Sequence, residues 1–96
     1  MPRQEEITIT GNSQFTDPLP VRKYFIVTIK AGTLVGTVAL QRQFLDNGTW
    51  DTVETFDDFT LDIVKNGSDN TGAQYRIGTT AFTSGSTTVR IEQREN

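Results

Sequence analysis

Two segments of this chain alternate apolar and polar residues and fold back through turn sequences, and this pattern constrains the fold most strongly. They cover residues 38–50 and 75–91. Side chains alternate with a period of two along a strand, whereas a helical face needs apolar residues three or four apart. The chain is also rich in threonine, valine, isoleucine and phenylalanine, which favour strands. An all-β fold is therefore predicted.

The spacing of the turn sequences predicts one antiparallel β-sandwich of about seven to eight strands, immunoglobulin-like or jelly-roll-like. The sandwich is expected over residues 6–93 of the 96-residue chain, a length typical of one domain. We expect residues 1–5 to form a flexible N-terminal arm and residues 94–96 a frayed C-terminal tail. The pattern leaves the order of the strands open.

The segment from Lys23 to Lys30 is the most apolar part of the chain. One face of this expected strand carries Phe25, Val27 and Ile29, and the other carries Tyr24, Ile26 and Thr28. A strand that is apolar on both faces is predicted to lie in the centre of a sheet, or to have one face covered by a partner chain.

Further features predict where strands begin, end and bend. Asp46-Asn47-Gly48 favours a tight hairpin turn, because asparagine and glycine tolerate a positive φ. A bulge or bend is expected between Trp50 and Val53, which have opposite parity. The next strand is expected to begin at Phe56 or to cover 59–63, followed by a flexible polar loop at 66–72 and a turn at 84–86. Arg42 falls in the inward register, so we expect its stem to pack and its head to reach water, or the strand to leave the core there.

Composition excludes several classes of function. The formal net charge is −3, and the nine lysines and arginines are dispersed, which argues against nucleic-acid binding. The chain contains no cysteine and no histidine, which removes disulfides, thiolate nucleophiles and the commonest general base. No apolar run has the length of a membrane span, and the N-terminus does not resemble a signal peptide. We therefore expect assembly in a reducing cytoplasm, without a membrane.

The acidic residues offer a candidate metal or catalytic site, namely Asp57, Asp58, Asp62 and Asp69. Carboxylate oxygens can bind calcium, and two carboxylates across a cleft can cleave glycosides. The spacing matches no calcium loop, and nothing in the sequence buries one carboxylate beside another. A solvated acidic face is the favoured interpretation, with no metal, no cofactor and no catalytic residue.

The large aromatic residues could form a platform for sugar rings; they are Trp50, Phe56, Phe59 and Tyr75. Each lies at an inward or strand-edge position, and large aromatic side chains dominate protein cores, so core packing is the favoured interpretation. The two glycosylation sequons, 47–49 and 66–68, coincide with turn sequences and are interpreted as turns. The hydroxyl-rich segment 83–86 lacks a nearby base, so we interpret it as a turn as well.

A family resemblance covers roughly residues 36–92. The run 38–44, ending in Leu-Gln-Arg-Gln-Phe, followed by Gly48-Thr49-Trp50 and a return strand with Val53, resembles small structural proteins of tailed bacteriophages. The later segments 75–77 and 83–91 are similar to the closing strands of that group. The same motifs also describe general immunoglobulin-like or fibronectin-like sandwiches, in which a residue such as Tyr75 forms a tyrosine corner.

The resemblance implies a non-enzymatic protein of the virion that decorates and stabilises the capsid by bridging capsomers. It also implies binding to the major capsid protein or to neighbouring virion subunits, and a homo-oligomer, with a trimer favoured. The alternative is a carbohydrate-binding or host-adhesion module of a phage fibre or tail. Residues of the partner-binding surface are not identified by the sequence.

Overall fold

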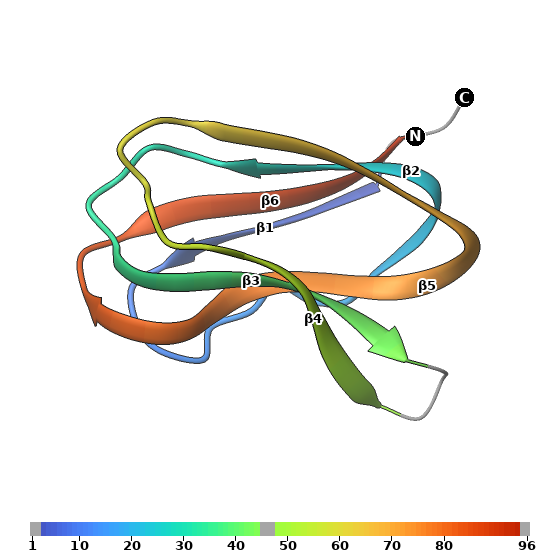
Figure 1. Cartoon of the computed structure of the whole chain (residues 1–96), viewed down its shortest axis with the longest axis horizontal. Helices are drawn as coiled ribbons and strands as arrows, with labels where there is room; N and C mark the ends of the chain where they lie inside the picture. The colour runs from blue at the N-terminus through green and yellow to red at the C-terminus, as the bar shows by residue number, and fades with distance from the viewer. Residues whose placement is uncertain (1–2, 45–47, 95–96) are drawn as a thin grey trace.

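The computed structural model describes residues 3–44 and 48–94, and every regular element among them is a β-strand (Figure 1). All strands pair antiparallel in one sheet with the order β1-β6-β2-β5-β3-β4. The predicted all-β antiparallel fold is confirmed, with six strands in the described part of the chain in place of about seven to eight. The strands are β1 (Arg3–Ile9), β2 (Leu19–Ile29), β3 (Val35–Phe44), β4 (Thr49–Phe56), β5 (Ile63–Ser84) and β6 (Thr87–Arg94).

One long strand, β5, joins the two parts of the sheet. Its first part pairs with β2 as far as Tyr75, and its second part pairs with β3 from Tyr75 onward. The sheet also curls on itself. This is shown by the 3.0 Å ion pair between Lys65 in the first part of β5 and Glu54 in β4, the edge strand of the sheet, which pairs with β3 and not with β5. The two layers of the predicted sandwich are therefore parts of one continuous sheet, which Figure 1 shows folded around its interior.

The hydrophobic core lies between these two parts; its fully buried residues come from every strand except β4, which contributes the partly buried Phe56. Buried positions alternate with more exposed ones along most of β2 and β6, as a half-buried sheet requires, whereas β3 buries four consecutive residues, 38–41. β2 pairs with β5 on one side and β6 on the other, so it is a central strand, as predicted. The buried core residues are Ile9, Leu19, Val21, Phe25, Val27, Ile29, Leu34, Val38, Leu40, Phe59, Tyr75, Ile77, Val89 and Ile91.

The segment 66–72, predicted as a flexible loop, lies within β5 instead. Gly67 pairs with Phe25, and the Phe25 ring lies over it: a Cβ at Gly67 would come within 2.3 Å of that ring. At the end of this segment Gly72 adopts a φ of 80°, and the register with β2 shifts between Val21 and Lys23. Turn-forming residues here build a bend within a strand, because cross-strand pairing overrides their local preference.

The predicted strand 59–63 is also wrong, because residues 57–62 connect β4 to β5 without strand structure. Phe59 is buried in the core, and its carbonyl accepts a hydrogen bond from the Gly32 backbone N–H at 2.9 Å. Leu61, predicted to share its face, is 76% exposed. One buried aromatic residue thus fixes the loop, whereas a strand would have buried alternate residues.

The sheet extends further at both ends than predicted. β1 begins at Arg3, which pairs with Gln93, so residues 3–5 belong to the sheet and not to the predicted arm. β6 extends to Arg94, the first residue of the predicted tail. The remainder of both predicted segments, residues 1–2 and 95–96, lies outside the described residues.

Several local predictions are confirmed. β3 and β4 form the predicted hairpin, with Phe44 paired with Thr49, although turn residues 45–47 lie outside the described part of the chain. The register shift opposite Leu40 and Gln41 leaves Val53 without a partner in the ladder, which is the expected bulge. The turn predicted at 84–86 is present as a connection of two residues, Gly85 and Ser86, after the last β5 residue, Ser84, and Gly85 has a φ of 83°.

Candidate functional site

The most polar buried group is the carboxylate of Asp69, at the bend of β5. Asp69 Oδ2 accepts a hydrogen bond from Arg42 Nε at 2.7 Å and from the Tyr75 hydroxyl at 2.8 Å. Asp69 Oδ1 accepts hydrogen bonds from the backbone N–H groups of Thr71 and Gly72, both at 3.1 Å. The carboxylate therefore closes the bend locally and also ties it to β3.

These contacts shift the pKa values of both titratable partners. Burial alone would raise the pKa of Asp69, but hydrogen bonds from Arg42, Thr71 and Tyr75 outweigh it and hold this pKa well below its usual range. Burial, together with the hydrogen bond to Asp69, raises the pKa of Tyr75 to about 12. A general acid or base needs a pKa near the working pH, so this network stabilises the fold and is unsuited to proton transfer.

The bond made by Tyr75 also differs from a tyrosine corner. The hydroxyl of a tyrosine corner bonds to the backbone a few residues upstream. The Tyr75 hydroxyl instead bonds to a side chain, that of Asp69, and its ring packs against Phe25 with centroids 4.7 Å apart. The Arg42 head pairs with the same carboxylate and is partly exposed, which agrees with a packed stem and a head that reaches water.

The four aspartates of the predicted acidic cluster are not brought together. Asp57, Asp58 and Asp62 lie in the β4–β5 loop, whereas Asp69 is buried at the bend. Asp58 accepts hydrogen bonds from the backbone and side chain of Thr60, which lower its pKa, and Asp62 accepts one from the Ala31 N–H at 2.6 Å. Within 3–44 and 48–94 no group of acidic residues is arranged to hold a metal ion.

The aromatic residues are also divided between two environments. Tyr75 and Phe59 are buried in the core, and Phe56 is partly buried against it, which agrees with the core interpretation. Trp50 is half-buried outside that core, on the outward face of the β3–β4 hairpin opposite Gln43. No common aromatic platform is formed.

Trp50 instead belongs to a cluster that the sequence did not predict. The guanidinium carbon of Arg76 lies 4.4 Å from the Trp50 ring centroid and 4.1 Å from the Phe15 ring centroid. Arg76 Nε donates to Gln41 Oε1 at 2.8 Å. Arg76 lies in β5, Trp50 in β4 and Phe15 in the connection between β1 and β2. We call these three residues the arginine–aromatic cluster, and Gln41, in β3, is its hydrogen-bond partner.

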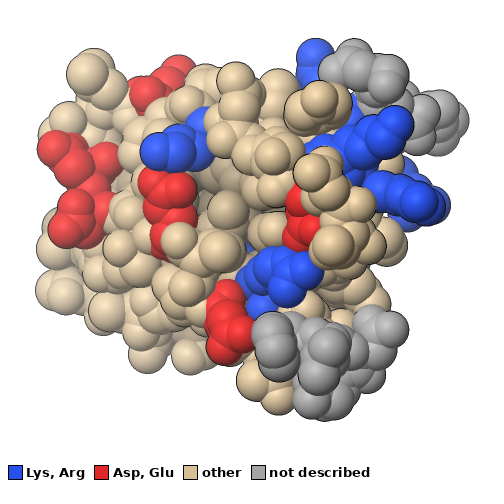
Figure 2. Space-filling view, turned by 45° about the vertical axis from the view of Figure 1, so that its right-hand side comes forward, with Lys and Arg blue, Asp and Glu red and all other residues tan. Residues whose placement is uncertain are grey.

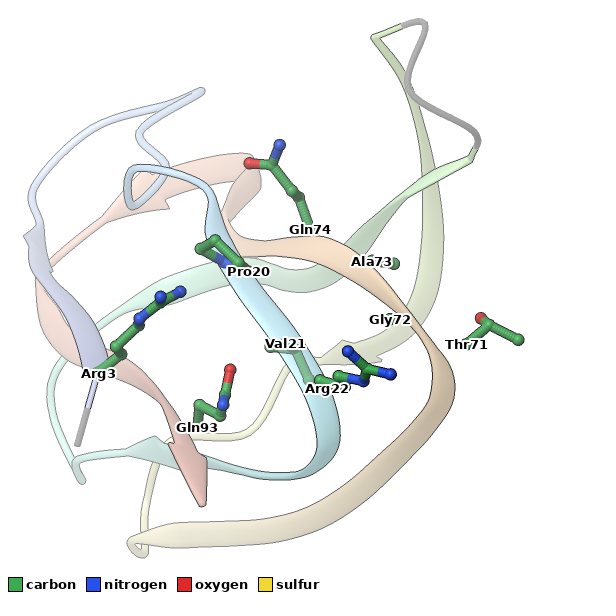
Figure 3. A pocket seen from close by; sticks show the side chains of 9 residues that line it. All are labelled: Arg3, Pro20, Val21, Arg22, Thr71, Gly72, Ala73, Gln74 and Gln93. Atoms are coloured by element: carbon green, nitrogen blue, oxygen red, sulfur yellow. The ribbon is translucent and has the colours of Figure 1, made fainter. Parts of the chain in front are cut away.

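The second feature is a shallow groove of about 530 Å³ across the start of β2. Figure 3 shows that Arg3 and Gln93 approach it from β1 and β6, whereas Arg22 extends toward Thr71 and Gly72, away from Arg3. The guanidinium groups of Arg3 and Arg22 therefore do not converge, and they do not form a single anion site.

Charged side chains are unevenly distributed over one face of the molecule. Figure 2 shows basic side chains gathered mainly at the right of this face and acidic ones mainly at the left.

The third feature is an apolar stripe on the outward face of β2 and β5. Tyr24 is 49% exposed and Val64 is 65% exposed, and Ile26 is partly exposed diagonally from Val64. On its other side the stripe is flanked by charged residues of β6, namely Arg90, Glu92 and Arg94. We call Tyr24, Ile26 and Val64 the outer stripe.

The remaining sequence candidates do not form a site in the described residues. Asn66, from the second sequon, lies on exposed β5 and not in the predicted turn, and Asn47, from the first, lies outside the described residues. Of the hydroxyl-rich segment 83–86, predicted as a turn, Thr83 and Ser84 are the last residues of β5, and only Gly85 and Ser86 connect β5 to β6.

No helix of membrane-spanning length and apolarity occurs in residues 3–44 or 48–94. Comparisons with known proteins add no assignment: no protein-family model and no curated protein matches the chain.

Proposed function

We propose that this protein is a non-enzymatic structural component of a phage virion, which decorates the capsid and stabilises it by bridging capsomers. The proposed partners are the major capsid protein or neighbouring virion subunits, and the proposed state is a homo-oligomer, with a trimer favoured. The proposal places the protein in virions that assemble in the host cytoplasm. Its starting point is the resemblance of residues 36–92 to small phage structural proteins.

The observation that carries this proposal is the outer stripe. Exposed apolar groups that are flanked by charged residues are typical of protein–protein contact surfaces. Tyr24 and Val64 project from the outward face of paired strands, so they can be covered without any change in the core. A contact of this kind needs only modest strength per subunit, because repetition on a symmetric shell raises the effective concentration of every linked site.

The test compares phage heads assembled with this chain and heads assembled without it. Heads with the chain should rupture at a higher temperature and a larger osmotic shock, and electron microscopy should show added density at capsomer junctions. Equal rupture temperatures, with no added density on expanded heads, would exclude the decorating role.

The alternative is a carbohydrate-binding or host-adhesion module of a fibre or tail. The position of Trp50 favours it, since the ring lies on an outward sheet face beside the polar groups of Arg76 and Gln41. A glycan array tests it directly. Binding that is lost in Trp50→Ala, with the outer stripe intact, would favour adhesion over decoration.

A further inference from the structure

The arginine–aromatic cluster holds one guanidinium group in a fixed position on the outside of the sheet. The segment that carries Phe15 is fixed to β5 by backbone hydrogen bonds from Thr79 N to Gln14 O and from Thr16 N to Ile77 O, both at 2.9 Å. Phe15 lies over Gly78, where a Cβ would come within 2.6 Å of the ring. The ring is therefore anchored beside Arg76, since only glycine permits this approach.

The opposite side of the cluster is also fixed. Gln41 accepts the hydrogen bond of Arg76 Nε, and Gln41 Nε2 donates to Thr52 Oγ1 at 3.2 Å. This chain of bonds runs from β5 through β3 to β4, the strand that carries Trp50. It uses one of the five N–H donors of the guanidinium group and leaves the four on Nη1 and Nη2.

The two Nη groups have no partner in the described part of the chain. The ion pairs among residues 3–44 and 48–94 join other residues, and none includes Arg76. In the same residues, no side-chain nitrogen or oxygen is both buried and without a hydrogen bond. The unpartnered Nη groups are therefore open to solvent, although Arg76 as a whole is half-buried.

This environment favours an anion. Burial lowers the pKa of Arg76, because the surroundings remove water from a positive charge without supplying a carboxylate. A carboxylate matches the spacing of two parallel N–H donors and would supply the missing charge. Arginine and tryptophan are also the residue types that most often dominate the binding energy of protein interfaces.

We propose that the arginine–aromatic cluster is a docking site for an aspartate or glutamate side chain of a protein partner, bound end-on by Nη1 and Nη2 of Arg76. A protein carboxylate is favoured over a polyanion such as nucleic acid, because the chain has a net charge of −3 and its other basic residues are dispersed. The inference uses the proposed function only for the identity of the partner, and the contact itself is tested without a phage particle.

Trp50 is the only tryptophan of the chain, so its fluorescence reports directly on this site. The purified full-length protein is titrated with hexaglutamate and, separately, with hexaglutamine. Hexaglutamate should change the Trp50 emission with a saturable dependence on concentration, and hexaglutamine should not. Arg76→Lys keeps the charge but loses the two parallel donors, and it should weaken the binding at least about tenfold.

Two matched variants separate this site from general charge effects. Arg90→Lys, in β6, and Arg22→Lys, in the groove, should keep the wild-type affinity for hexaglutamate. Should Arg76→Lys unfold, the Arg76 Nε–Hε signal in a nitrogen-15 spectrum of the wild-type protein should still shift on addition of hexaglutamate. The proposal would be overturned if wild type and Arg76→Lys bound hexaglutamate with equal affinity, or if Arg22→Lys lost this binding. It would also be overturned if the Trp50 emission responded to oligogalacturonate, a sugar polyanion, and not to hexaglutamate.

Discussion

Asp69 accepts hydrogen bonds from β3, from the bend of β5 and from Tyr75, so a neutral amide of the same shape cannot satisfy all of them. Asp69→Asn removes the charge opposite Arg42 and places an NH₂ group against other donors. We expect the free energy of unfolding to fall by about 2 kcal/mol at neutral pH. Urea denaturation measures this loss, and Asp57→Asn, in the exposed loop, is the matched control.

The effect of Asp69→Asn on the free energy of unfolding should depend on pH. The folded protein lowers the pKa of Asp69 from 3.8, so the carboxylate contributes stability that is present above this pH and is lost as pH falls below it. The difference in unfolding free energy between wild type and Asp69→Asn should therefore shrink below about pH 4. A constant difference between neutral and strongly acidic pH would contradict the assigned contacts.

The stability that Tyr75 contributes should be lost at high pH, whereas that of Asp69 is lost at low pH. Its pKa is raised from 10.0 to about 12, so the protonated hydroxyl contributes stability that is complete below the lower value and is lost as pH rises through the higher one. Tyr75→Phe keeps the ring against Phe25 and should cost about 1 kcal/mol at neutral pH. The cost should fall between these two pH values, as measured by thermal unfolding of both proteins in parallel.

At the scale of the strand, β5 pairs with β2 through residue 67 because Gly67 has no side chain and leaves room for the ring of its cross-strand partner, Phe25. Gly67→Ala would place a methyl group within 2.3 Å of the ring, and we expect a destabilisation of about 2 kcal/mol. Gly11→Ala is the control, since its nearest neighbour is a flexible glutamine at 3.4 Å. A smaller residue at position 25, as in Phe25→Leu, should recover part of the loss in the double variant, and chemical denaturation measures all four proteins.

This strand also marks the limit of prediction from sequence. The alternation in β2 and β6 and the parity change at Val53 were predicted, because each depends on residues near one another in the chain. Residues 66–72 have the composition of a loop, and only pairing with β2 makes them a strand. The contact of Arg76 with Phe15 and Trp50 joins three distant segments, so no local pattern could have indicated it.

At the scale of the whole molecule, the interior and the outer stripe are separate, so association and stability should respond to different substitutions. Val64→Thr and Tyr24→Thr remove exposed apolar groups and keep residue types that favour strands. We expect this double variant to unfold within about 0.5 kcal/mol of the wild type. In sedimentation experiments it should be a monomer where the wild type is an oligomer.

Leu61→Thr provides the matched control for that comparison, because Leu61 is 76% exposed in the β4–β5 loop, outside the outer stripe. Its mass in solution should equal that of the wild type. A general loss of surface apolarity would affect both variants, whereas a specific contact responds only to the stripe. If the double variant and the wild type sediment with the same mass, the outer stripe does not hold subunits together, and oligomer formation must use another surface.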